Sequence, residues 1–201
     1  MLDTSPRTVV LVDGSIESLT CAAIAMDRIE ANNQSAKVLA LSFFERSESA
    51  ENHSLQQAIE RQFEFLGCTP SSTELQASVG RLGLVKALDL AGPQGTILWG
   101  HRCTMNPDAI ADTLALVDHL AGVARYSQPS YLVHFDLPLL DLTAGQVLDL
   151  ASALGAPLGA CWSCQHAGHA PCGECPSCSS WLEASKASGR PLPWVETPTV
   201  G

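Results

Sequence analysis

Thr8-Val-Val-Leu-Val-Asp-Gly-Ser-Ile-Glu-Ser18 opens the pattern that the rest of the chain repeats. Its first half is a continuous, mostly β-branched run, which is typical of a strand buried on both faces of a parallel sheet. Its second half is a short turn of small and acidic residues. An alanine-rich stretch from Leu19 to Ile29 then reads as a helix. The stretch therefore predicts a strand, a tight turn and a helix, in that order.

Strand-like and helix-like segments alternate as far as about residue 155. The predicted strands are Lys37–Phe43, Thr96–Trp99 and Tyr131–Phe135, and the predicted helices are Ser54–Leu66, Arg81–Leu90, Pro107–Ala121 and a last one from Thr143 to about Leu154. Such alternation predicts an open parallel sheet with helices on both faces. We expect this α/β domain to occupy residues 1–158, a metal-binding segment to occupy 159–182, and a poorly ordered tail to occupy 183–201.

Composition limits the kind of protein. The chain has 201 residues, of which 46% are hydrophobic and 16% charged, as in an ordinary globular protein. No run approaches the roughly 20 apolar residues that cross a bilayer, and the N-terminus lacks the apolar core of a signal sequence. We therefore expect no membrane association and a cytoplasmic address, where thiols stay reduced.

The charge balance excludes one class of partner. With 21 acidic and 11 basic residues, the formal net charge is −10. Such a surface repels phosphate backbones, so we expect no large nucleic-acid footprint. A small nucleotide in a local pocket remains compatible with this charge.

Five cysteines gather near the C-terminus, in Cys161-Trp-Ser-Cys164 and Cys172-Gly-Glu-Cys175-Pro-Ser-Cys178. Two-residue gaps let one turn of backbone present successive sulfurs to the same ion. The preferred ligands of a tetrahedral zinc site are Cys164, Cys172, Cys175 and Cys178. Cys161 is a spare thiol that could replace Cys164.

Other interpretations of the cluster stay open from the sequence. Disulfides would need an oxidising compartment, and an iron–sulfur cluster would also use four cysteines. His166 and His169 are further potential ligands, although exposed loop positions are the simpler interpretation for both.

A second candidate site lies where strands end, because ligands of open α/β sheets bind at the carboxyl ends of strands. The turn from Asp13 to Ser18 leads into a helix N-terminus, whose N–H groups and dipole suit a phosphate. A plain tight turn explains these residues equally well. His101, Arg102 and Cys103 follow another strand end and are either ligand-facing or simply exposed.

These two regions together resemble one family. The segments Trp162-Ser-Cys164 and Cys172-Gly-Glu-Cys-Pro-Ser-Cys178 resemble the zinc signature of the 7-cyano-7-deazaguanine synthase (QueC) family of PP-loop ATP pyrophosphatases. The strand and turn at residues 8–18 resemble that family's pyrophosphate loop. Shorter likenesses lie between them, at Gly80-Arg81, Leu98-Trp99-Gly100, Pro138-Leu139 and Leu154-Gly155.

The resemblance implies an adenine nucleotide alpha hydrolase-like fold, a structural zinc ion, and an ATP- and Mg²⁺-dependent ligase that converts a deazapurine carboxylate to a nitrile for queuosine. If the chain is such an enzyme, Gly14, Ser15, Ser18 and Arg81 would contact phosphate, Asp108 would contact the substrate, and Asp13 and Glu17 could hold magnesium. The family is often dimeric, which leaves a homodimer open.

The chain departs from the family where the chemistry should lie. Asp13 replaces a serine of the loop, Ser15 replaces a glycine, and Ala144 replaces a lysine. An aspartate places a carboxylate where phosphate oxygens should sit. The alternative hypothesis is therefore a catalytically inactive QueC-like zinc protein that binds a ligand or a partner, and the sequence does not decide whether the chain is an enzyme.

Overall fold

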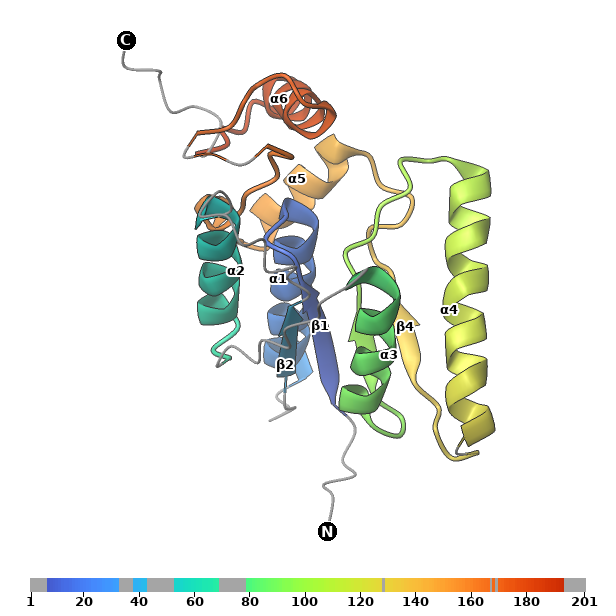
Figure 1. The fold of residues 1–201 in the computed structure, drawn as a ribbon. Coiled ribbons are helices and arrows are strands. Elements are labelled where there is room, and N and C mark those ends of the chain that lie inside the picture. The colour runs from blue at the N-terminus through green and yellow to red at the C-terminus, as the bar shows by residue number, and fades with distance from the viewer. Residues whose placement is uncertain are drawn as a thin grey trace.

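The fold is built on a parallel four-stranded sheet in the order β2-β1-β3-β4 (Figure 1). It is seen in a computed structural model, which describes residues 7–32, 38–42, 53–68, 79–127, 129–166, 168 and 170–193. The strands are β1 (Thr8–Val12), β2 (Val38–Ser42), β3 (Thr96–Leu98) and β4 (His134–Asp136). The helices are α1 (Ile16–Asn32), α2 (His53–Phe65), α3 (Val79–Ala91), α4 (Pro107–Ser127), α5 (Ala144–Ala153) and α6 (Pro176–Ser188), with a short 3-10 helix, η2 (Leu158–Ala160), between the last two.

Helices cover both faces of the sheet, as predicted. Val10 and Val12 of β1 pack into one apolar cluster with residues of α1, α2, α5 and α6. Val9 and Leu11, which point to the opposite face, pack with residues of α3. In Figure 1, α1 and α2 accordingly lie on one side of the strands and α3 and α4 on the other. The predicted fold class, an open parallel α/β sheet, is confirmed.

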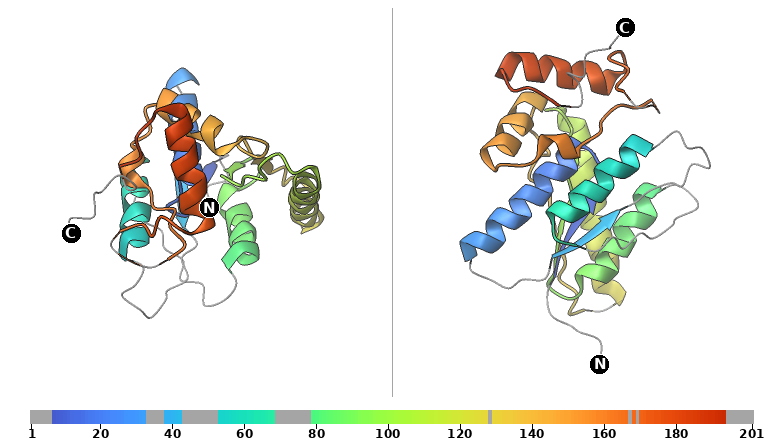
Figure 2. Two further views of the ribbon diagram at one scale, coloured as in Figure 1. Left: turned by 90° about the horizontal axis from the view of Figure 1, so that it is seen from above. Right: turned by 90° about the vertical axis from the view of Figure 1, so that its left-hand side faces the viewer.

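The C-terminal segment lies across the end of the sheet to which β1 runs. Figures 1 and 2 show α6 above the carboxyl ends of the strands, beside α5 and over the start of α1. Trp181 of α6 is 1% exposed and belongs to the same apolar cluster as Ile16 of α1. The sulfur-rich segment is therefore packed on the α/β domain, next to the first turn.

Helix α1 begins earlier than the sequence pattern predicts, at Ile16 rather than Leu19. The cause is a side-chain cap, because Ser15 Oγ accepts the N–H of Ser18 at 3.1 Å. Glu17 and Ser18 therefore lie in the first helical turn and not in the connecting turn.

Two further boundaries differ from prediction. Strand β4 begins at His134 instead of Tyr131, because its neighbour β3 has only three residues, Thr96–Leu98, with which it can pair. Leu132, which precedes β4, is 57% exposed. Helix α6 runs to Ser188, six residues past Leu182, where the metal-binding segment was expected to end, and Gly189 ends the helix in a left-handed conformation with φ of 66°. The expected tail thus begins with helical residues, 183–188, and 194–201 lie outside the described residues.

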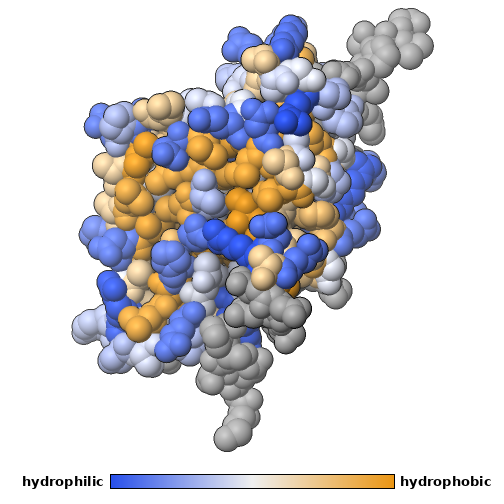
Figure 3. Space-filling view, turned by 180° about the vertical axis from the view of Figure 1, so that it is seen from behind, coloured by the Kyte–Doolittle hydropathy of each residue, from blue (hydrophilic) through white to orange (hydrophobic). Residues whose placement is uncertain are grey.

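The surface carries several exposed apolar side chains. Four of them lie on α4, namely Leu114, Leu116, Val123 and Tyr126. Apolar residues also gather across the middle of the face seen from behind (Figure 3). Within the described ranges, none of the helices has both the length and the apolar character that crossing a membrane requires.

Gly100 marks a close approach between the loop after β3 and the start of α1. A Cβ added there would lie 2.7 Å from the Glu17 carbonyl carbon and 2.9 Å from Ser18 N. Both atoms belong to the backbone of the first helical turn and cannot move aside cheaply. The loop that follows β3 therefore rests directly on the N-terminus of α1.

We predict that Gly100→Ala lowers the free energy of unfolding by about 1–3 kcal/mol, because the new methyl group must displace helix backbone. The matched control is Gly122→Ala on α4, where the nearest atom to an added Cβ is 3.9 Å away. That change should leave stability unchanged or raise it by about 0.5–1 kcal/mol, as alanine favours helix. Urea denaturation measures both, and equal effects of the two variants would contradict the close approach.

Candidate metal centre and first turn

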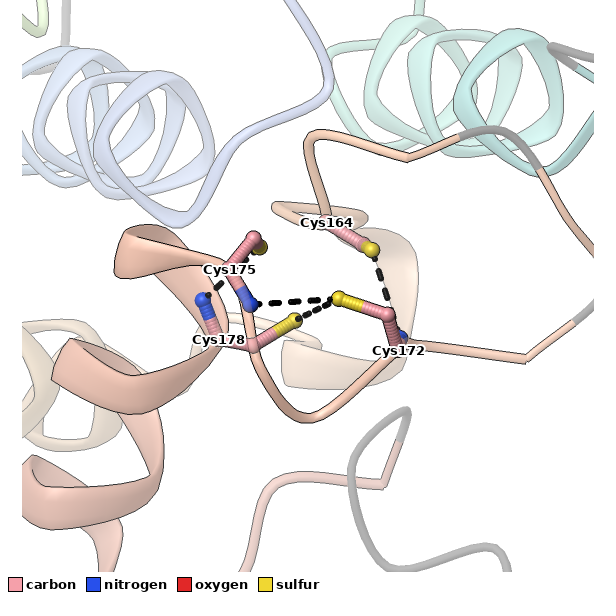
Figure 4. Close-up of side chains that lie close together, drawn as sticks. All are labelled: Cys164, Cys172, Cys175 and Cys178. Atoms are coloured by element: carbon pink, nitrogen blue, oxygen red, sulfur yellow. Dashed lines mark hydrogen bonds between the residues drawn. The ribbon is translucent and has the colours of Figure 1, made fainter.

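Four cysteine sulfurs converge at the N-terminus of α6. The ligand atoms of Cys164, Cys172, Cys175 and Cys178 all lie within 4.8 Å of one another, and Figure 4 shows the side chains pointing toward one another. Cys175 is the N-cap of α6, and Pro176 follows in the first turn, where its fixed φ suits a helix start. The helix start thus places Cys175 and Cys178, and the irregular loop before it supplies the other two.

Backbone amides point at these sulfurs. The N–H of Cys175 donates to Cys172 Sγ at 3.3 Å, and that of Cys172 donates to Cys164 Sγ at 3.4 Å (Figure 4). The N–H of Gln165 donates to Cys175 Sγ at 3.5 Å. Amide donors stabilise a sulfur that carries negative charge. The surroundings of the cluster therefore suit thiolates, which are the form of cysteine that binds metals.

The spacing of the sulfurs fits a single metal ion. Cys172 Sγ and Cys178 Sγ lie 3.9 Å apart, whereas a disulfide bond would bring them to about 2.05 Å. Four thiolates in a tetrahedron around zinc, each about 2.3 Å from the ion, would stand about 3.8 Å apart. All eight cysteines are unpaired. The cluster can hold a metal, and the disulfide interpretation is not the one that the structure adopts.

Burial and hydrogen bonding shift the pKa values of two of these thiols in opposite directions. Burial raises the pKa of the Cys175 thiol, but hydrogen bonds from the amides of Gln165 and Cys178 outweigh it and lower the pKa to about 6. Burial, together with the neighbouring Cys175, raises the pKa of Cys178. A bound cation would lower the pKa of every thiol in the group, because it stabilises each sulfur as a thiolate.

The other candidate ligands lie elsewhere. Cys161 is 3% exposed, and its Sγ donates to the Leu158 carbonyl oxygen at 3.0 Å, so it remains a core residue outside the group of four. His166 is exposed, and His169 lies outside the described residues. The structure thus brings together the four preferred thiols and leaves Cys161 as the spare.

The polar groups of the first turn form hydrogen bonds with one another. Asp13 Oδ1 accepts the N–H of Ser15 at 2.9 Å and its hydroxyl at 2.5 Å. Because Ser15 Oγ also caps the N–H of Ser18, these two amides of the helix N-terminus already have partners within the chain. A carboxylate of the protein therefore occupies the position at which a phosphate oxygen would meet the Ser15 amide.

A buried glutamine ties the same turn to the C-terminal segment. Gln62 of α2 is fully buried, and its Oε1 accepts the Ser18 hydroxyl at 2.7 Å. Its Nε2 donates to the carbonyl oxygens of Ser15 at 2.9 Å and Ala160 at 3.1 Å. The sequence analysis did not single out Gln62. Its position next to Phe63, on the buried face of α2, could have indicated a buried polar side chain that needs hydrogen-bond partners.

Glu17 faces an arginine from the loop after β3. Arg102 Nε lies 3.2 Å from Glu17 Oε1, and the two side chains are only 13% and 17% exposed. The Arg102 guanidinium also lies 5.4 Å from the ring centre of Trp181 on α6. Burial raises the pKa of Glu17, and the charge of Asp13 adds to that effect while Arg102 opposes it. Two of the three residues predicted to be either ligand-facing or exposed at this strand end are not exposed, since the Arg102 side chain is 13% exposed and Cys103 is buried.

The remaining predicted site residues are less informative. The Gly14 carbonyl oxygen accepts the N–H of Trp162 at 2.8 Å, which joins the first turn to the segment that carries Cys164. Asp108 is exposed in the first turn of α4, where the Asn106 side chain accepts its amide hydrogen. The side chain of Arg81 lies outside the described residues. The phosphate, magnesium and substrate roles of all these residues therefore stay predictions.

Comparison with known proteins yields one family. The family described as Queuosine biosynthesis protein QueC matches residues 101–189. The 7-cyano-7-deazaguanine synthase of Synechococcus sp. (strain RCC307) is 33% identical over 86 residues, which cover 42% of this chain and 39% of that protein. The 7-cyano-7-deazaguanine synthase of Koribacter versatilis (strain Ellin345) is 26% identical over 94% of this chain and 93% of its own length.

Among solved structures, the U34-tRNA thiolase NcsA from Methanococcus maripaludis with its [4Fe-4S] cluster aligns with a TM-score of 0.48 and 17% identity, covering 94% of this chain and 67% of that one. That score is too low to define a relationship.

Fold and site together define the class: a parallel α/β protein with a C-terminal group of four thiols that could hold a metal ion. The matching segment, residues 101–189, includes all four cysteines and is similar to the QueC family.

We predict that replacing any one of Cys164, Cys172, Cys175 or Cys178 with serine removes most of the bound metal, since a closed thiolate site needs all four ligands. The matched control is Cys161→Ala, which deletes the spare thiol and should keep the metal content of the parent protein. Metal analysis of the purified variants measures the difference. Loss of metal from Cys161→Ala together with retention in Cys164→Ser would mean that the first ligand has been misassigned.

Proposed function

We propose that this chain is a QueC-like zinc protein that binds a deazapurine-like ligand or a protein partner and does not turn over ATP at its first turn. The observation that carries the proposal is the internal hydrogen bonding of Asp13, Ser15 and Ser18. In a working phosphate loop, amide and hydroxyl donors face the nucleotide. Here they face the chain's own carboxylate, hydroxyl and amide oxygens.

Electrostatics adds a cost to nucleotide binding. Two like unit charges about 4 Å apart repel by about 4 kcal/mol at an effective dielectric constant near 20. A phosphate that approached the Ser15 amide would meet the Asp13 carboxylate at such a distance, unless Asp13 moved or took up a cation. Magnesium could supply that cation, but its other proposed ligand, Glu17, already pairs with Arg102.

Zinc is the metal that the geometry supports best. The thiolates of a four-iron cluster bind four different iron atoms at separate corners, so their sulfurs stand farther apart than sulfurs around one ion. The 3.9 Å separation of Cys172 and Cys178 matches the edge of a single-ion tetrahedron. The exposure of Cys172 and Cys164 is no obstacle, because a closed four-ligand site needs no open position for a substrate.

A second candidate is the ATP-dependent 7-cyano-7-deazaguanine synthase reaction, or a related ATP-dependent amidation. The end-to-end similarity to the Koribacter versatilis relative favours it. In that role Gly14, Ser15, Ser18 and Arg81 would contact phosphate, Asp13 and Glu17 would hold magnesium, and Asp108 would contact the substrate. The first turn would then have to open, with Asp13 leaving the Ser15 amide.

The other expectations from the sequence are part of this proposal. A cytoplasmic location would keep the thiols reduced and available to zinc. The net charge of −10 argues against a large nucleic-acid footprint. A homodimer stays a prediction.

We predict that titration of the purified protein with ATP and Mg²⁺ by calorimetry gives no binding at millimolar nucleotide, because the donors of the first turn are occupied. Zinc content measured on the same sample shows that the protein is folded and loaded. Saturable binding, or pyrophosphate release in the presence of a deazapurine carboxylate and ammonia, would favour the synthase over the non-catalytic protein.

We also predict close to one zinc ion per chain in protein purified under reducing conditions, as four thiolates around a single ion require. Inductively coupled plasma mass spectrometry measures zinc and iron together. Well under one zinc per chain, or about four iron atoms per chain, would contradict the zinc assignment.

A further inference from the structure

The segment that carries the four cysteines is joined to the first turn by three contacts. One is the hydrogen bond from the Trp162 amide to the Gly14 carbonyl oxygen, two residues before Cys164. Another is Gln62, whose side-chain amide donates to both Ala160 and Ser15. The third is Arg102, which lies between Glu17 of α1 and Trp181 of α6.

The third contact is the one that reaches α6, the helix that carries Cys178. Trp181 follows Cys178 on α6 by three residues, so both lie on neighbouring positions of one helical face. Trp181 is 1% exposed and Cys178 is fully buried, which fixes the ring relative to the sulfur. Any shift of the start of α6 therefore moves the aromatic face over which the Arg102 guanidinium lies.

Arg102 transmits such a shift to Glu17 because the pair is mostly buried. An ion pair with side chains 13% and 17% exposed is poorly screened by water, so each charge depends on the other for compensation. Thr104 takes a further hydrogen bond from Arg102 at 3.1 Å, which holds the guanidinium in one orientation. Glu17 lies between Ile16 and Ser18, in the turn of helix that the Asp13 and Ser15 cap completes.

We propose that metal binding at the four cysteines controls the closed state of the first turn, with Arg102 as the positioning residue that couples α6 to Glu17. With metal bound, the start of α6 is fixed, and Trp181 and Arg102 hold Glu17 in the first helical turn of α1. Without metal, the four sulfurs lose their common partner, α6 loses its anchored start, and the turn from Asp13 to Ser18 opens. This inference rests on the zinc binding that is part of the proposed function. It adds an effect of that zinc on the first turn.

Hydrogen–deuterium exchange with peptide-level mass spectrometry tests this coupling. The probe is zinc alone, compared between the full-length protein loaded with one equivalent and the same protein stripped by a chelator. Three regions are followed: the first turn at residues 13–20, the metal segment at 161–188, and α4 at Pro107–Ser127 as an internal reference. Zinc removal should speed exchange in the first two regions and leave α4 unchanged.

Variants of charged residues separate coupling from general destabilisation. In zinc-loaded Arg102→Gln, exchange at residues 13–20 should rise roughly tenfold while the zinc content and the protection of α6 stay at parent values. The matched control is Arg125→Gln, whose guanidinium forms an exposed ion pair with Asp118 at 3.9 Å, and it should change nothing in the first turn. Glu17→Gln should resemble Arg102→Gln, and the double variant should add little to either.

The coupling is overturned if zinc removal speeds exchange only in residues 161–188. It is also overturned if exchange in α4 speeds up as much as in the first turn, since the metal would then stabilise the whole chain. Equal effects of Arg102→Gln and Arg125→Gln also overturn it. A chain that takes up no zinc refutes the proposed function first, whereas a loaded chain with an unaffected first turn refutes the coupling alone.

Discussion

The convergence of four sulfurs within 4.8 Å is the constraint on which the arrangement of the C-terminal segment depends. Between η2 and α6 the chain has no regular hydrogen-bonded element among its described residues, so its path is set by the thiols and by the amides that donate to them. This segment delivers the Trp162 amide to Gly14 and starts the helix that carries Trp181. A metal at this point would therefore position groups well beyond its own ligands.

The first turn joins β1 to the N-terminus of α1. Gly14 adopts a left-handed conformation there, with φ of 81°, which glycine tolerates because it has no Cβ. The donors of this turn have partners within the chain, since Asp13 accepts both the N–H and the hydroxyl of Ser15. The match to the QueC family covers residues 101–189, which include the four cysteines and leave out the first turn.

Much of the fold could be predicted from sequence, because it depends on local periodicity and spacing. The alternation of strands and helices predicts the parallel sheet, and the two-residue gaps after Cys172 and Cys175 predict that these thiols converge. The polar contacts could not be predicted, because their partners lie far apart in the chain. Glu17, Arg102 and Trp181 come from three separate elements, and no local pattern pairs them. The early start of α1 was missed for a different reason, as a single serine cap decided it.

X-ray absorption spectroscopy at the metal edge of the purified protein would identify the ion bound by the four cysteines, because it reads the number, type and distance of the ligands around it. We expect a zinc signal with one shell of four sulfur atoms at about 2.3 Å and no metal–metal scattering. An iron edge with a short iron–iron vector, or a zinc shell with nitrogen or oxygen in place of sulfur, would contradict a single ion held by Cys164, Cys172, Cys175 and Cys178.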